Sequence, residues 1–76
     1  MDAKKLEKII DGFTSAVTFI YNDRQCGVDP LSRTKYDVWY GDIVVTVDSL
    51  DKVMNCNIFD DKPLKEIATI AENFEY

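Results

Sequence analysis

Apolar positions near the N-terminus repeat at helical spacing. Four of them follow the i, i+3, i+4, i+7 pattern of one helical face, and they are Leu6, Ile9, Ile10 and Phe13. Asp2 precedes this stripe with a side chain suited to capping a helix N-terminus, and Gly12 lies where helices commonly end. The pattern predicts a helix between these two residues.

The next residues are rich in β-branched and aromatic side chains, which favour strands. Residues 16–21 predict one strand and residues 24–28 a second, with a tight turn at 22–23 between them. A two-residue loop places Phe19 opposite Cys26. We therefore expect a hairpin with one apolar face.

A second hairpin follows a predicted loop. Residues 29–34 contain Pro30 and a polar cluster that breaks both periodicities, so we expect no regular structure there. Residues 35–40 and 43–47 then flank a Gly-Asp pair at 41–42, which suits a type II′ turn. The turn and the alternation of apolar residues predict the same register, so this hairpin is the best-defined element of the sequence.

The register assigns the side chains of the second hairpin to two faces. One face is apolar or aromatic and consists of Tyr36, Val38, Tyr40, Ile43, Val45 and Val47. The opposite face receives Asp37, Trp39, Val44 and Thr46. Because an antiparallel sheet commonly leaves one face uncovered, we expect this second set to lie on the open side.

The last part of the chain predicts two helices. Asp48 is placed to cap a short helix, whose apolar residues are Leu50, Val53 and Met54. Pro63 suits the first turn of a final helix that follows Asp60 and Asp61. The apolar stripe of that helix consists of Leu64, Ile67, Ala68, Ala71 and Phe74.

The predicted order of elements is αββββαα. This order predicts an α+β fold, in which a four-stranded antiparallel sheet of two hairpins carries helices packed on one face. The length of 76 residues fits a single domain over residues 1–76.

The chain is acidic, with nine Lys and Arg against fourteen Asp and Glu and a formal net charge of −5. The whole excess lies in residues 39–76, because basic and acidic residues balance in residues 1–38. An acidic balance disfavours nucleic-acid binding, which needs basic groups to displace counterions from phosphates. It favours a protein partner with a basic surface.

The chain contains no histidine, which excludes imidazole-based nucleophile pairs and imidazole metal ligands. Its two cysteines, Cys26 and Cys56, form no C-x-x-C motif and are too few for a closed zinc site. We therefore predict a protein that is not an enzyme and binds no cofactor or metal. The thiols are expected to be free packing residues, with a disulfide between them left open as an alternative.

The N-terminus shows no signal-peptide pattern, and the longest purely apolar run covers only residues 43–45. Neither feature suits a signal peptide or a membrane span. The sequence therefore predicts a cytoplasmic protein without membrane contact.

Trp39 is the leading candidate for contact with a partner, because Trp is a favoured anchor in protein interfaces. Its predicted neighbours Asp37, Val44 and Thr46 share that surface. The further candidates are the acidic residues Asp48, Asp51, Asp60 and Asp61.

Three alternatives stay open. In the first, Trp39 packs under the loop at 29–34 or under a long side chain. In the second, the acidic residues act only as helix caps. Self-association through an edge strand or the Trp39 face is the third.

An alternative function is weak nucleic-acid binding by the Arg24–Tyr40 region. Arg24, Arg33 and Lys35 interleave there with Tyr36 and Tyr40, an arrangement that can contact single strands. Both tyrosines are also expected in the core, which favours the protein-binding interpretation.

The segment from Trp39 to Glu72 contains the runs WYGD, SLDKVM and IFDDKPLKEI. It resembles small uncharacterised proteins of phages and prophages, in which a short helix and a phenylalanine precede an Asp-Gly-Lys-Ser-Leu-like helix start. Asp61 stands at the position of the Gly, and Pro63 at that of the Ser. The resemblance implies an accessory or host-interaction protein, including an inhibitor of a host defence, and it transfers no functional residues.

Overall fold

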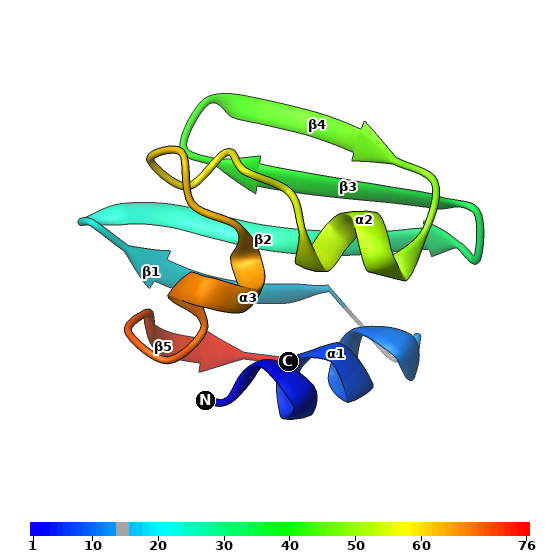
Figure 1. Cartoon of the computed structure of the whole chain (residues 1–76), viewed down its shortest axis with the longest axis horizontal. Helices are drawn as coiled ribbons and strands as arrows, with labels where there is room; N and C mark the ends of the chain where they lie inside the picture. Colours follow the sequence, from blue (N-terminus) through cyan, green and yellow to red (C-terminus); the bar gives the residue numbers. More distant parts are fainter. Residues whose placement is uncertain (14–15) are drawn as a thin grey trace.

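The computed structural model describes residues 1–13 and 16–76, and these residues form an α+β fold (Figure 1). The elements in chain order are α1 (Ala3–Asp11), β1 (Val17–Tyr21), β2 (Arg24–Ser32), β3 (Lys35–Tyr40), β4 (Ile43–Val47), α2 (Leu50–Met54), α3 (Leu64–Ile67) and β5 (Glu72–Glu75). The predicted class is confirmed. The predicted four strands and the order αββββαα are wrong in detail, because a fifth strand follows the last helix.

The five strands form one antiparallel sheet in the order β4-β3-β2-β1-β5. Consecutive strands from β1 to β4 are neighbours, so the sheet grows by hairpins. The helices lie on one side of it (Figure 1), where α1, α2 and α3 contact one another. The result is two layers, and none of the described helices covers the other face of the sheet.

The turns have the backbone angles that their residues favour. Asn22 and Asp23 both have positive φ, at 54° and 61°, as a type I′ turn requires. Gly41 has a φ of 59° and supplies the positive angle at the first position of a type II′ turn. The predicted registers are therefore confirmed, including the pairs Phe19 with Cys26 and Trp39 with Val44.

The predicted loop at 29–34 is wrong, because β2 continues to Ser32 and only a turn at 33–34 precedes β3. Pro30 is compatible with this strand because its backbone nitrogen points toward the β1 side. There β1 pairs only as far as Val17 opposite Val28, so the missing N–H costs no ladder hydrogen bond with the described strand.

The predicted long final helix is also wrong, because α3 ends at Ile67 and residues Glu72–Glu75 form β5 instead. The strand satisfies the outer backbone groups of β1, with Thr18 opposite Glu75 and Ile20 opposite Glu72. Asn73 has a φ of 56°, which the helix would not allow. Phe74 still reaches the core, but from a strand, and stacks on Phe19 at a centroid distance of 5.0 Å.

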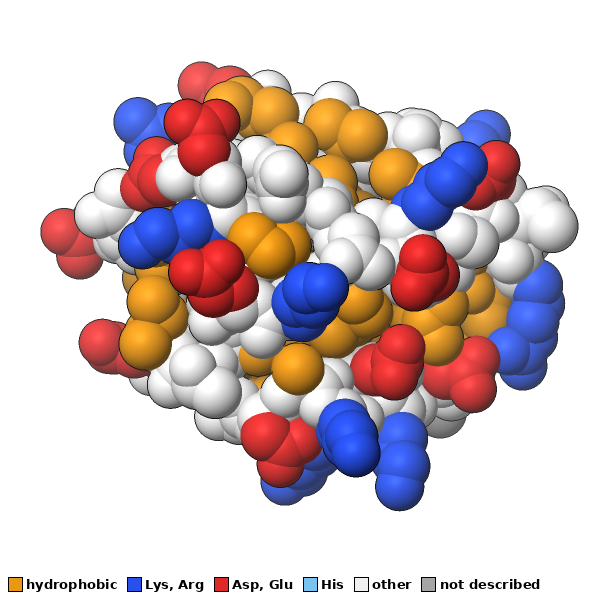
Figure 2. All heavy atoms as spheres, viewed as in Figure 1, with side chains coloured by type: hydrophobic (Ala, Val, Ile, Leu, Met, Phe, Trp, Pro, Cys, Tyr) orange, Lys and Arg blue, Asp and Glu red, His pale blue; other side chains and the backbone are white. Residues whose placement is uncertain are grey.

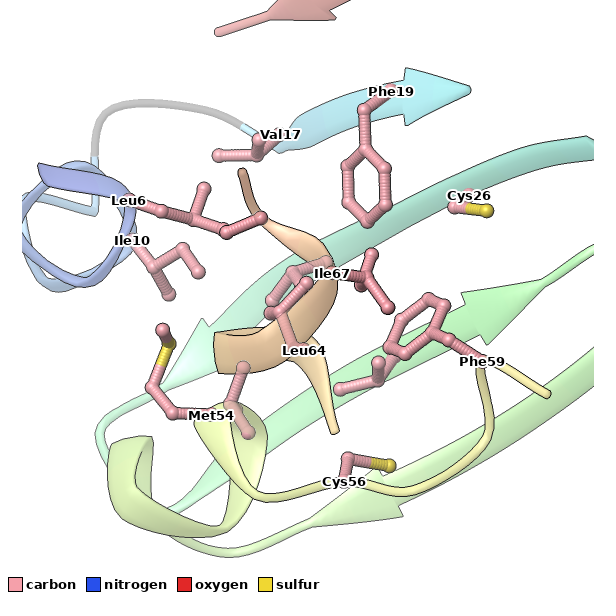
Figure 3. Packing of buried hydrophobic residues seen from close by; sticks show 14 of the residues in the cluster. Leu6, Ile10, Val17, Phe19, Cys26, Met54, Cys56, Phe59, Leu64 and Ile67 are labelled. Atoms are coloured by element: carbon pink, nitrogen blue, oxygen red, sulfur yellow. The ribbon is translucent and has the colours of Figure 1, made fainter. Parts of the chain in front are cut away.

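The core lies between the helices and the sheet (Figure 3). Leu6 and Ile10 enter it from α1, while Leu64 and Ile67 enter it from α3. Phe59, on the connection between α2 and α3, points into the middle of this cluster and is completely buried. The predicted Asp2 cap is confirmed, because its Oδ1 accepts a hydrogen bond from the Lys5 N–H at 2.8 Å.

None of the helices in the described part of the chain is long and apolar enough to cross a membrane.

Candidate functional site

The face of the sheet opposite the helices brings together half of the predicted site. Tyr36, Val38 and Tyr40 of β3 are buried beneath the helices, so the alternating residues of that strand point to the other side. The cross-strand pairs then place four predicted residues on the same face: Asp37, Trp39, Val44 and Thr46. We call this the open face; the neighbouring strands add Thr18, Ile20, Gln25, Gly27 and Asp29 to it.

Trp39 lies over the backbone of Gly27, its partner across β2 and β3. A Cβ atom built on Gly27 would overlap the indole and lie 2.7 Å from its Cε2 atom. The missing side chain of Gly27 therefore makes the space in which the ring sits, and the ring in turn buries the glycine. This close approach is the usual reason for a glycine inside a strand.

Trp39 therefore does not pack under a loop at 29–34, since residues 29–32 belong to the sheet itself. Its side chain is half-buried, and the neighbouring Val44 is 61% exposed. Gly27 is the residue of this face that the sequence interpretation missed. A strand glycine opposite a Trp was the signal that could have identified it.

Asp37 and Thr46 form a cross-strand pair beside Trp39. The Thr46 hydroxyl donates a hydrogen bond to Asp37 Oδ1 at 2.6 Å. Asp29 lies opposite Asp37 on the other side, in β2, so two carboxylates share this part of the open face. Like charges in this position repel one another, and a cation from a partner would relieve that repulsion.

The predicted acidic residues do not form one surface. Asp48 and Asp51 lie at the start of α2, where Ser49 rather than Asp48 is the N-cap, with its Oγ accepting from the Lys52 N–H at 3.2 Å. Asp48 instead forms an exposed ion pair with Lys52 at 3.0 Å. The prediction that Asp48 caps this helix is therefore wrong. Asp48, Lys52 and Thr46 line one shallow hollow on the surface, so Asp48 adjoins the open face.

Asp60 and Asp61 lie at the opposite end of the sheet, beside the β1–β2 and β3–β4 turns. They do not cap α3, whose N-cap is Pro63. Both have positive φ, at 56° and 63°, and they form a turn closed by the Lys62 N–H donating to the Phe59 carbonyl at 3.1 Å.

The Asp60 carboxylate joins three segments of the chain. Its Oδ2 accepts from Asn22 Nδ2 at 2.7 Å and from the Tyr40 hydroxyl at 3.2 Å. Asn22 belongs to the β1–β2 turn, whereas Tyr40 is the last residue of β3 and adjoins the β3–β4 turn. These hydrogen bonds give Asp60 a structural role that does not depend on a partner.

On the helix-covered side, acidic and basic side chains are interspersed rather than gathered by sign (Figure 2). No wide patch of one charge is visible on that side of the molecule. The open face is therefore the better candidate for recognising a partner, because there Asp29 and Asp37 lie side by side next to an aromatic ring.

The alternative nucleic-acid site of the Arg24–Tyr40 region lacks the accessible tyrosine rings that it would need for base stacking. Tyr36 and Tyr40 are only 2% and 3% exposed, so their rings are not accessible to bases, as the core interpretation predicted. Arg24 lies over the Tyr40 ring at 5.2 Å, and Arg33 pairs with Asp11 at 2.7 Å. Two of the three basic side chains thus have partners within the fold.

Cys26 and Cys56 are both buried and free, so the alternative of a disulfide is wrong. The Cys26 thiol donates to the Arg24 carbonyl at 3.3 Å. Burial raises the pKa of Cys26 from 9.0 to about 11, and burial raises the pKa of Cys56 as well. Raised values keep both thiols protonated and unreactive near neutral pH. Among the described residues, no three His, Cys, Asp or Glu side chains gather as metal ligands would.

The raised pKa of Cys26 predicts a loss of stability at alkaline pH. The unfolded thiol ionises near 9.0, whereas the folded thiol stays protonated up to about 11. The free energy of unfolding therefore falls progressively as the pH rises from 9.0 to about 11. Below this window the thiol is protonated in both states, and no stability is lost. Urea unfolding at about pH 8 and about pH 11 should show a smaller alkaline loss in Cys26→Ala than in the wild type. Equal losses in the two proteins would contradict the prediction.

Comparison of the chain with protein-family models, with curated proteins and with solved structures finds no match.

Proposed function

We propose that this protein is a small non-enzymatic interaction protein that binds another protein through its open face. The observation that carries the proposal is Trp39, which is half-buried in the middle of a sheet face without a helix. An aromatic ring held against a glycine is a rigid anchor, because its position is set before any partner arrives. Val44, directly across from it on β4, extends the apolar surface.

The partner that fits this face carries basic side chains. Asp29 and Asp37 lie opposite one another, next to the Trp39–Gly27 pair on the same face, and Asp48 lies beyond Thr46 at the end of β4. The net charge of −5 adds long-range attraction toward a basic surface. Asp51, Asp60 and Asp61 contribute to that field from outside the open face.

We further propose that the partner is a protein of a host cell. This part rests on the resemblance of residues 39–72 to phage and prophage proteins, and an accessory or inhibitor role follows from it. The acidic charge is consistent with a protein that competes for a basic binding surface.

Trp39→Ala is expected to weaken binding by about 30-fold or more, as truncation of a central aromatic anchor does. The wild type is used to capture proteins from a lysate of the native host, and the affinity of each purified partner is then measured by titration calorimetry. Val44→Ala is the second variant on the face, because it leaves the Gly27 contact in place and should weaken binding less.

The double variant Asp60→Asn/Asp61→Asn tests whether the other end of the sheet takes part. Under the proposal it binds within about threefold of the wild type, because a distant exposed charge changes affinity little. Circular dichroism establishes that each variant is folded. Loss of binding in the Asp60/Asp61 variant with full binding in both face variants would contradict the proposal, and so would capture of nucleic acid in place of protein.

A further inference from the structure

The two edges of the sheet differ in how they are protected. The β5 edge is short, carries Glu72 and Glu75, and pairs with β1 in an irregular register. Asn73 adds a positive φ of 56° within it. Charges, irregular pairing and short length are the usual protections against the addition of another strand.

The β4 edge is one residue longer, and it has neither a charge within the strand nor a break in its pairing. Its five residues, Ile43–Val47, are all β-branched and uncharged, and they pair with β3 without a break in register. Ile43 is 48% exposed and Val44 is 61% exposed. Figure 1 shows β4 along the upper border of the sheet, with no other described element beyond it. This strand is a regular, apolar and accessible edge.

The register shows which backbone groups of β4 point outward. Tyr40 and Ile43 flank a two-residue turn, so they exchange hydrogen bonds with one another. The alternation then directs the N–H and C=O groups of Val44 and Thr46 away from β3. The same alternation on β3 requires Gly41 to bond toward β2, and its N–H does donate to the Gln25 carbonyl at 2.8 Å.

We propose that an extended segment of a basic partner protein pairs with β4 and becomes a sixth strand of the sheet. This inference rests on the proposed function and specifies how the partner binds. The outward groups of Val44 and Thr46 would supply the main-chain hydrogen bonds. Asp42 and Asp48 lie at the two ends of β4 and complement a segment that carries Lys or Arg at both ends of a short β-branched core, where the added cation would share Asp48 with Lys52.

A second copy of the chain fits this edge less well. Antiparallel pairing of two β4 strands over their full length puts Val44 opposite Thr46 of the second copy. Asp42 then lies opposite Asp48 of the second copy, and symmetry repeats this pair of like charges. Each copy also brings a net charge of −5. The charges at the strand ends and the net charge therefore favour a basic segment over this self-pairing.

The test uses a synthetic peptide, acetyl-Lys-Val-Thr-Val-Thr-Val-Lys-amide, with alternate core amides N-methylated so that one pairing edge remains and the peptide does not self-assemble. Binding is followed by amide chemical shifts and hydrogen exchange of the ¹⁵N-labelled protein. We expect slowed exchange at Val44 and Thr46. A peptide with every core amide methylated, and one with Glu in place of Lys, should each bind about tenfold more weakly or worse.

On the protein side, Val44→Pro removes one outward N–H at an edge position where proline is tolerated. It should bind the peptide about tenfold more weakly than the matched variant Val44→Thr, which replaces the same side chain but keeps the outward N–H. If Val44→Pro does not fold, the comparison of the two methylated peptides decides the question with the wild-type protein alone.

Two results would overturn the inference: equal binding of both methylated peptides, or self-association of the free protein that Val44→Pro abolishes. Failure of this inference and of the proposed function can be told apart with the native partner. A partner that is lost in Trp39→Ala but retained in Val44→Pro supports the open face and rejects β4 pairing. A partner that is retained in Trp39→Ala and in Val44→Thr but lost in Val44→Pro supports β4 pairing and rejects Trp39 as the anchor.

Discussion

Phe59→Ala is expected to reduce the free energy of unfolding by about 3–5 kcal/mol, the usual cost of truncating a buried Phe. The ring is completely buried and contacts Phe19 and Tyr40 at centroid distances of 5.9 and 5.8 Å. A chain of 76 residues has a total stability of about 4–11 kcal/mol at typical values per residue. The variant would thus lose a large share of the stability of the whole fold.

Urea unfolding followed by circular dichroism measures this effect. The matched control is Ile70→Ala, because Ile70 is 57% exposed and its truncation should change the stability by less than about 0.5 kcal/mol. If the two variants unfold at the same urea concentration, then Phe59 is not the central packing residue that its burial indicates.

Gly27→Ala is expected to displace Trp39 and to destabilise the protein by about 1–3 kcal/mol, the usual range for overpacking. The added Cβ atom would overlap the indole ring, and the sheet backbone beneath it has little room to move. Trp39 is the only Trp of the chain, so its fluorescence reports the displacement directly. We expect the emission to shift to longer wavelength as the ring becomes exposed to water.

A double-mutant cycle separates this clash from a general weakness of β2. Once Trp39→Ala has removed the ring, Gly27→Ala should cost almost nothing, because alanine suits a strand no worse than glycine. An additive loss in the double variant would show that the ring does not occupy the space above Gly27. The cycle also tests the geometry on which the proposed anchor depends.

Much of the sheet could be predicted because local signals agreed with one another. Between residues 35 and 47 the alternation of side chains and the Gly-Asp turn both required the same pairing, and that pairing is observed. The C-terminal segment offered no such agreement. Its apolar residues fit a helix, but the outer backbone groups of β1 required a partner strand, and this long-range pairing prevailed over local periodicity.

The candidate site could be predicted in part for the same reason. The alternation along β3 and β4 was sufficient to place Asp37, Trp39, Val44 and Thr46 on one face. The acidic residues were harder, because an Asp suits a helix start and a turn with positive φ equally well. Asp60 occupies such a turn, and its partners Asn22 and Tyr40 are distant in sequence.

The unequal edges of the sheet also determine how many strands can be added to one molecule. Under the proposed pairing, an added strand enters at β4, because the charged and irregular β5 edge at the opposite border disfavours strand addition. Continuous growth by pairing of edge strands requires two accessible edges on each molecule. A molecule with one accessible edge does not support it. Complexes formed through β4 should accordingly contain one added strand per molecule and should not extend into filaments.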